Sequence, residues 1–139
     1  IILKKYSPIG ELSAFAKQYA ESLAQTLNCL VCICDMDQVI AASGAGKKEL
    51  QGQSVGSQFQ KTIEGRSSVI AQAGEHKYVS ILNGQQEEYQ SEVIVPIICE
   101  GDVVGGVVLL NKDLKRKFAD TEQKMASCAA VFLGKQMEQ

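Results

Sequence analysis

The chain begins and ends with segments in which apolar residues recur at helical spacing. From Leu12 to Leu27 the interval is three or four residues, which predicts a helix with one apolar face. Ser7-Pro8 offers an N-cap for this helix, and Asn28 is placed to end it. A closing helix is predicted over residues 121–137, with Asp120 as its N-cap and Gln123 completing a capping box.

Runs of β-branched and other apolar residues between these helices predict strands. The runs span residues 29–34, 39–42, 78–82, 92–99 and 103–110. Only four polar or flexible residues, 35–38, separate the first two, so they form an antiparallel hairpin. A helix over residues 55–64 ends at Gly65, and residues 66–69 begin another short helix or turn. This order predicts an α+β fold, an antiparallel sheet with helices on both sides.

Two positions inside the predicted strands restrict where those strands lie. Pro96 has no N–H to donate, so its strand belongs at a sheet edge or carries a bulge there. Gly105-Gly106 in the last strand implies a bulge or a close approach of another part of the chain.

Length and charge narrow the class of protein. The chain of 139 residues is near the usual length of one domain, and its net charge of −2 argues against binding of nucleic acid by this chain. Lys115-Arg116-Lys117 is its densest basic run and is interpreted as a solvated loop. Because no apolar run is long enough to cross a membrane, we expect a cytoplasmic protein without a membrane partner.

Five cysteines raise the question of a metal or redox site. Cys29, Cys32 and Cys34 fall in one predicted strand, and alternation points Cys29 away from the other two. A metal site would need a turn that brings the thiolates to one side. The cysteines are therefore interpreted as buried small apolar residues, and we expect neither a metal site nor a cofactor.

The segment 43–48, Ser-Gly-Ala-Gly-Lys-Lys, suggests a phosphate-binding loop because glycines and lysine occur together. The spacing of a P-loop is absent, however, and no long helix is predicted directly after it. Phosphate binding here stays a minor alternative.

The closing segment resembles that of GAF domains, small regulatory domains that sense ligands or mediate pairing. The resemblance rests on Asn111-Lys112 after a strand, followed by Phe118, Asp120 and Glu122 at the start of a helix. The whole chain also resembles the C-terminal GAF domains of sporulation transcription factors of the transition-state-regulator type. Its matching pieces are residues 2–9, 33–35, 43–44, 66–69, 96–97, 101–102 with Gly105 and Val107, and 136–139.

This resemblance implies both a fold and a role. The fold is a GAF-like central antiparallel sheet of about five to six strands, flanked by the terminal helices on one face and by short helices and loops on the other. Residues 1–6 are the end of a preceding swapped-hairpin DNA-binding domain or linker, and residues 7–139 are the GAF-like domain. The role is a regulatory, oligomerising or ligand-sensing module for the DNA-binding domain.

The apolar faces of the terminal helices predict a homodimer, with a tetramer possible in the full-length protein. Two helices from each subunit would form a four-helix bundle. The alternative is that both stripes are core within one chain. The predicted interface residues are Leu12, Ala16, Tyr19, Leu23, Met125, Ala129, Phe132 and Gln136.

A ligand pocket is the second property that the resemblance implies. We expect it on the sheet face opposite the terminal helices, under residues 47–72, with an unidentified small molecule as its ligand. The candidate lining residues are Cys34, Ser43, Phe59, Ser67, Ser68, Ile81, Val93 and Val95.

The competing class is a small GAF-fold thiol enzyme such as a free methionine sulfoxide reductase. Such enzymes use cysteines in loops near the pocket, whereas three of the cysteines here fall in one strand. His76 is the single histidine and lies in a predicted exposed turn. We therefore predict no catalytic residues.

Overall fold

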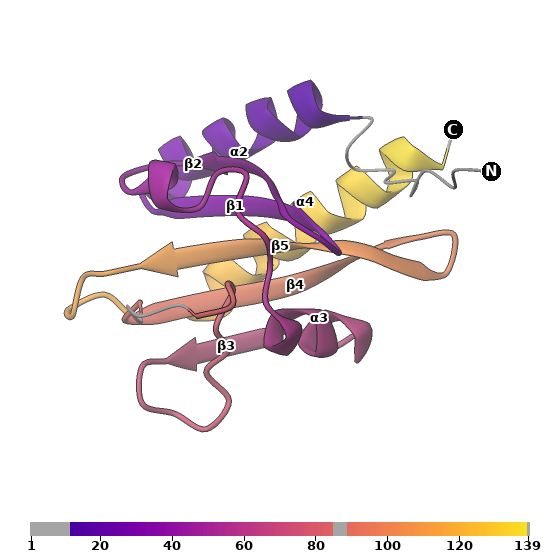
Figure 1. The fold of residues 1–139 in the computed structure, drawn as a ribbon. Coiled ribbons are helices and arrows are strands. Elements are labelled where there is room, and N and C mark those ends of the chain that lie inside the picture. The colour runs from indigo at the N-terminus through magenta and orange to yellow at the C-terminus, as the bar shows by residue number, and fades with distance from the viewer. Residues whose placement is uncertain (1–11, 85–88, 139) are drawn as a thin grey trace.

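The computed structural model describes residues 12–84 and 89–138 (Figure 1). The predicted cap at Ser7-Pro8 and the predicted domain boundary after residue 6 lie outside these residues. The helices are α2 (Ser13–Leu27), α3 (Ser57–Glu64) and α4 (Asp120–Met137), with a short 3-10 helix η1 (Lys47–Glu49). The strands are β1 (Leu30–Asp35), β2 (Val39–Ser43), β3 (Val69–Gln72), β4 (Ser91–Cys99) and β5 (Asp102–Asn111).

The five strands form one antiparallel sheet in the order β2-β1-β5-β4-β3. The β1–β2 hairpin is the predicted one, with Cys32 opposite Ala42. The long β4–β5 hairpin places Ile94 opposite Val108 at the centre of the sheet. The predicted α+β class and the predicted number of strands are confirmed.

The sheet separates two apolar layers. On one face α2 and α4 bury alanines and leucines, such as Ala16, Leu23 and Leu133, against Val31 and Val107. On the other face α3 buries Phe59 and Ile63 together with Cys32, Cys34 and Ile94. Figure 1 shows α2 (indigo) along β2, α4 (yellow) crossing the sheet, and α3 near β3. The terminal helices thus share one face, as predicted.

Two segments differ from the prediction. Residues 69–72 form the strand β3, which pairs with residues 91–94 of β4, and not a short helix or turn. Residues 78–82 form no named strand and carry only the isolated bridge between Val55 and Leu82. Tyr78, Val79 and Ile81 are buried although they pair in no strand ladder, and the buried Glu92 carboxylate accepts the Val79 N–H at 2.6 Å. Burial therefore produced a strand-like pattern where no strand exists.

The predictions for Pro96 and Gly106 are confirmed. Because β3 pairs only with residues 91–94, no strand of the described residues lies on the outer side of β4 at Pro96, where a residue without an N–H is tolerated. A Cβ atom on Gly106 would lie 3.0 Å from the Phe59 ring, which is the close approach that the glycine pair implied.

The start of α4 is displaced from the prediction. Ala119, and not Asp120, is the residue that precedes the first helical turn. The Glu122 carboxylate accepts the Ala119 N–H at 2.7 Å, so Glu122 performs the role that was assigned to Gln123. Glu122 stands three residues after the true cap, which is the reach that a capping box needs.

No helix among the described residues is both long and apolar enough to cross a lipid bilayer.

Candidate functional site

A cluster of aromatic rings lies between the outer surfaces of α2 and α4. The Phe15 and Phe132 rings stack with centroids 5.7 Å apart and an interplanar angle of 16°, and Tyr19 lies 5.5 Å from Phe132. Phe132 is 41 % exposed and its neighbour Val131 is 58 % exposed. We call Phe15, Tyr19 and Phe132 the aromatic patch. Large apolar groups that remain in water on a folded domain commonly mark an interaction surface.

The structure divides the predicted interface residues into two groups. Ala16, Leu23 and Ala129 are buried against the sheet within this chain. Leu12, Tyr19, Met125 and Gln136 are half-buried, and Phe132 is exposed. The surface available to a partner is therefore the outer side of each helix. Phe15 lies on this side but was not among the predicted interface residues.

The predicted ligand-binding residues do not converge on one cavity. Cys34, Phe59 and Ile81 belong to the layer under α3, whereas Val93 and Val95 belong to the layer under α2 and α4. Ser67 and Ser68 are exposed, and Ser43 is half-buried on β2. Phe59 and Ile63 are fully buried against the sheet where the pocket was expected. The predicted set is split by the sheet itself.

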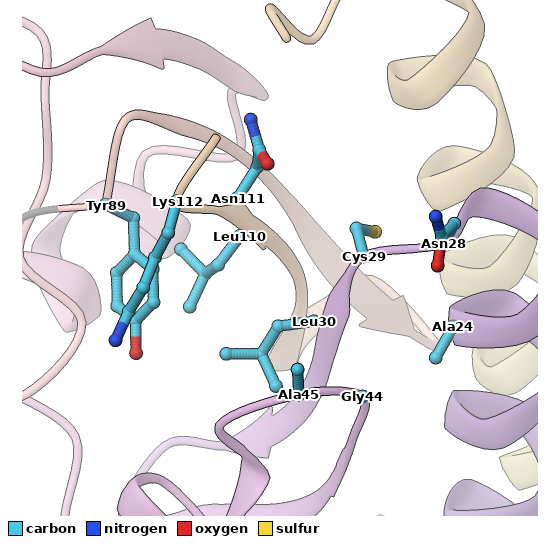
Figure 2. Close-up of a pocket in the computed structure, with 10 residues that line it drawn as sticks. All are labelled: Ala24, Asn28, Cys29, Leu30, Gly44, Ala45, Tyr89, Leu110, Asn111 and Lys112. Carbon is cyan, nitrogen blue, oxygen red and sulfur yellow. The ribbon is translucent and has the colours of Figure 1, made fainter. Parts of the chain in front are cut away.

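A different cavity, of about 230 Å³, opens between the C-terminal end of α2 and the end of β5 (Figure 2). Figure 2 shows Tyr89 and Lys112 side by side on one wall, with Ala24, Asn28 and Cys29 on the opposite wall. None of the predicted ligand-binding residues lines it. Its lining residues are Ala24, Asn28, Cys29, Leu30, Gly44, Ala45, Tyr89, Leu110, Asn111 and Lys112.

The positive charge of Lys112 in this cavity is already balanced by a neighbouring carboxylate. The Lys112 ammonium lies 5.3 Å from the centre of the Tyr89 ring and 3.8 Å from a Glu49 carboxylate oxygen. Burial raises the pKa of Cys29 to about 11, with smaller and opposed effects of Arg116 and Glu122. The thiol is therefore neutral at physiological pH, and the cavity suits an uncharged, mainly apolar molecule.

Arg116 ties the wall of this cavity to α2. Its guanidinium donates to the Leu27 carbonyl at 2.5 Å and to the Asn28 carbonyl at 2.7 Å. Its own carbonyl accepts the Asn111 side-chain amide at 2.8 Å. The interpretation of residues 115–117 as a solvated loop was thus wrong for Arg116, which satisfies the last carbonyls of a helix.

The thiols of Cys29, Cys32 and Cys34 do not form a reactive centre. Burial raises the pKa of Cys32 to about 12 and that of Cys34 well above the ordinary range, so both are protonated. Cys29 packs in the layer under α2 and α4, and Cys32 and Cys34 lie across the sheet from it, as alternation predicted. A thiol enzyme needs an accessible thiolate, which these three positions do not supply.

Comparison with known proteins gives a family and a fold. A family described as "Stage V sporulation protein T C-terminal, transcription factor" matches residues 11–138. Stage V sporulation protein T of Bacillus subtilis (strain 168) is 42 % identical over 139 residues, which are all of this chain and 76 % of that protein.

Solved structures support the fold alone, because their sequence identity is low. The GAF domain of a phosphoenolpyruvate-protein phosphotransferase from Acinetobacter has a TM-score of 0.73 at 17 % identity, covering 96 % of this chain and 84 % of that one. A type II free methionine-R-sulfoxide reductase from Thermoplasma acidophilum has a TM-score of 0.63 at 16 % identity, covering 91 % and 94 %.

Proposed function

We propose that this chain, which belongs to the stage V sporulation protein T C-terminal family of transcription factors, regulates DNA binding by joining subunits through its aromatic patch. The chain is a regulatory GAF domain, and its family is one of non-enzymatic transcription regulators.

The observation that carries the proposal is a cluster of contacting rings from both terminal helices, in which Phe132 is exposed and Phe15 and Tyr19 are half-buried. Phe15 and Tyr19 come from α2, and Phe132 comes from α4, so the patch includes side chains of both helices. Two copies related by a two-fold axis would bury the same patch on each subunit. The four helices would then pack as a bundle, with most of the association energy from the aromatic side chains.

Association at α2 would determine the spacing of the DNA-binding domains. We infer that residues 1–6 are the end of the preceding DNA-binding domain, so that α2 follows it within a few residues. A bundle of α2 and α4 helices would hold two such domains at a fixed separation, and a further pairing would give a tetramer. The chain itself has a net charge of −2, so we expect the DNA contacts to come from the preceding domain, in the cytoplasm.

We also infer that the cavity in Figure 2 is the place where a small molecule would influence association. Asn28 and Asn111 both line this cavity, and both bond to Arg116. A molecule bound between them would change how firmly α2 is held against the end of β5. Native mass spectrometry of the purified chain would detect a retained molecule, and Ala45→Trp, which narrows the cavity from its exposed rim, should release it.

The experiment on the whole regulator replaces Phe132 with Glu and measures both its subunit number and its affinity for promoter DNA. We expect a smaller assembly and weaker DNA binding, because two linked DNA-binding domains hold one site more tightly than separate ones. Leu114→Glu is the matched control, since Leu114 is 77 % exposed on a loop outside the patch. Unchanged assembly and unchanged affinity in the Phe132 variant would refute the proposal.

A further inference from the structure

A second cavity, of about 400 Å³, lies between the first half of α2, the edge strand β2 and the short helix η1. It is separate from the cavity in Figure 2 and has no lining residue in common with it. Figure 1 shows α2 running along β2. The lining residues are Ser13, Ala14, Lys17, Ile40, Ala41, Ala42, Lys47, Lys48 and Gln51.

The strand side of this cavity is apolar, and its backbone is already satisfied. Ala41 and Ala42 are buried and Ile40 is half-buried. The Gln51 side chain accepts the Ala42 N–H and donates to the Ile40 carbonyl, both at 2.8 Å. Because Gln51 already forms hydrogen bonds with these two backbone groups of the edge strand, they cannot pair with an added peptide strand. Any ligand would gain its polar contacts from the rim.

The rim carries three lysines and no acid. Lys17 comes from α2, and Lys47 and Lys48 come from η1. Within residues 12–84 and 89–138, no carboxylate lies within 4.0 Å of these three ammonium groups. The nearest acid in sequence to η1's lysines, Glu49, faces Lys112 instead, at 3.8 Å. In a chain with a net charge of −2, this is a local concentration of positive charge without a partner.

From this arrangement we propose that the cavity binds a small organic phosphate, with the phosphate among the three lysines and a short apolar group against β2. The lysine ammonium is a compact point charge that suits phosphate, whereas planar two-point recognition of a carboxylate favours arginine, and no arginine lines the cavity. Of residues 43–48, Lys47 and Lys48 thus contribute to a phosphate site that is not a P-loop.

Such a ligand would join two parts of the fold that are distant in the sequence. Lys17 stands on the helix that carries Phe15 and Tyr19, and Lys47 and Lys48 stand on the loop after β2. Binding should therefore stabilise the attachment of α2 to the sheet, and the melting temperature should rise with the logarithm of the ligand concentration above the dissociation constant. This inference does not depend on self-association through the aromatic patch.

The test is a calorimetric titration of the full chain with phenyl phosphate, which combines a phosphate with a small apolar ring. Inorganic phosphate and phenol are the separate halves of the probe. We expect saturable binding of phenyl phosphate in about the 0.1–1 mM range, tighter than either half, and weaker at higher salt. Thermal unfolding with the same compounds should give the same order.

Single variants Lys17→Gln, Lys47→Gln and Lys48→Gln should each weaken phenyl phosphate binding by about twofold to fivefold, as expected for partly exposed ion pairs. The triple variant should show no saturable binding. Lys61→Gln, an exposed lysine on α3 at the other sheet face, is the control and should bind like the unmodified chain.

The proposal would be overturned by no saturable binding of phenyl phosphate by the unmodified chain, by equal loss in Lys61→Gln, or by binding of phenol as tight as that of phenyl phosphate. Tighter binding of duplex DNA than of phenyl phosphate through the same lysines would also overturn it, because the site would then belong to nucleic acid.

Discussion

Gly134 of α4 lies directly against the backbone carbonyl of Ile98 in β4. A Cβ atom at this position would collide with that carbonyl oxygen, which belongs to the backbone and cannot turn aside. The contact brings α4 close to the sheet, and Phe132, two residues before Gly134, stacks on Phe15 of α2. The geometry of the aromatic patch therefore depends on a glycine that packs against the sheet beneath it.

Replacement of Gly134 with Ala should destabilise the domain by about 1–3 kcal/mol, because the overpacking cost exceeds the gain in helix propensity. Chemical denaturation would measure the change. Gly65→Ala is the matched control: Gly65 has a helical φ of −71°, and an added Cβ would meet its nearest neighbour at 3.4 Å, an ordinary contact. A stabilised Gly134→Ala variant would show that this contact is not tight.

Replacement of Arg116 with Ala should cost about 1.5–3 kcal/mol of unfolding free energy, since two charge-assisted hydrogen bonds to the end of α2 are lost. Arg116→Lys should recover only part of this, because one ammonium does not reproduce the paired geometry of a guanidinium. Lys115→Ala and Lys117→Ala, exposed neighbours, serve as controls. Equal stability of all three alanine variants would contradict the role given to Arg116.

Alkaline pH should weaken the fold through its buried thiols. The pKa values of Cys29 and Cys32 are raised from 9.0 to about 11 and about 12, so the unfolded chain loses these protons at a lower pH than the folded chain. Their contribution to stability is complete below about pH 9 and is lost as the pH rises towards 11 to 12.

Denaturation at a series of pH values would measure this slope. Cys32→Ala should be less stable at pH 7 by about 1–2 kcal/mol through lost volume, yet its stability should fall less steeply above pH 9. A slope identical to that of the unmodified chain would show that Cys32 does not titrate on unfolding in this range.

Periodicity predicted the elements whose side chains meet the core regularly. Helices α2, α3 and α4, the β1–β2 hairpin and the β4–β5 pair all follow patterns that burial imposes. The strand β3 was missed because its four residues pair with β4, a partner that lies about twenty residues further along the chain. Local pattern carries little information about such a pairing.

The site was less predictable, because it depends on which face each strand presents. Alternation indicates that Val93 and Val95 share a face, but only the packed helices decide that this face lies under α2 and α4. The same limit applies to Ala16 and Ala129, which were predicted as interface residues. Their helical stripes pack against the sheet, so these two side chains are buried in the core of the chain itself. The apolar stripe of the last helix predicted Phe132 as an interface residue, but only the structure shows that its side chain is exposed to solvent.

Arg116 illustrates a different limit. Its partners, the carbonyls of Leu27 and Asn28, lie far away in the sequence and are backbone atoms, which no side-chain pattern reports. A basic run in a loop was therefore indistinguishable from a solvated one until the end of α2 was placed beside it.

The central claim, self-association through the aromatic patch, is tested most directly by sedimentation velocity of this chain. The unmodified chain should sediment as a dimer or larger species at about 10 µM, and Phe132→Ala should shift it towards the monomer. Leu114→Ala is the control, because it also removes an exposed apolar side chain but outside the patch. Circular dichroism must show that each variant is folded. A folded, unmodified chain that remains monomeric at this concentration, or an equal effect of Leu114→Ala, would contradict the account.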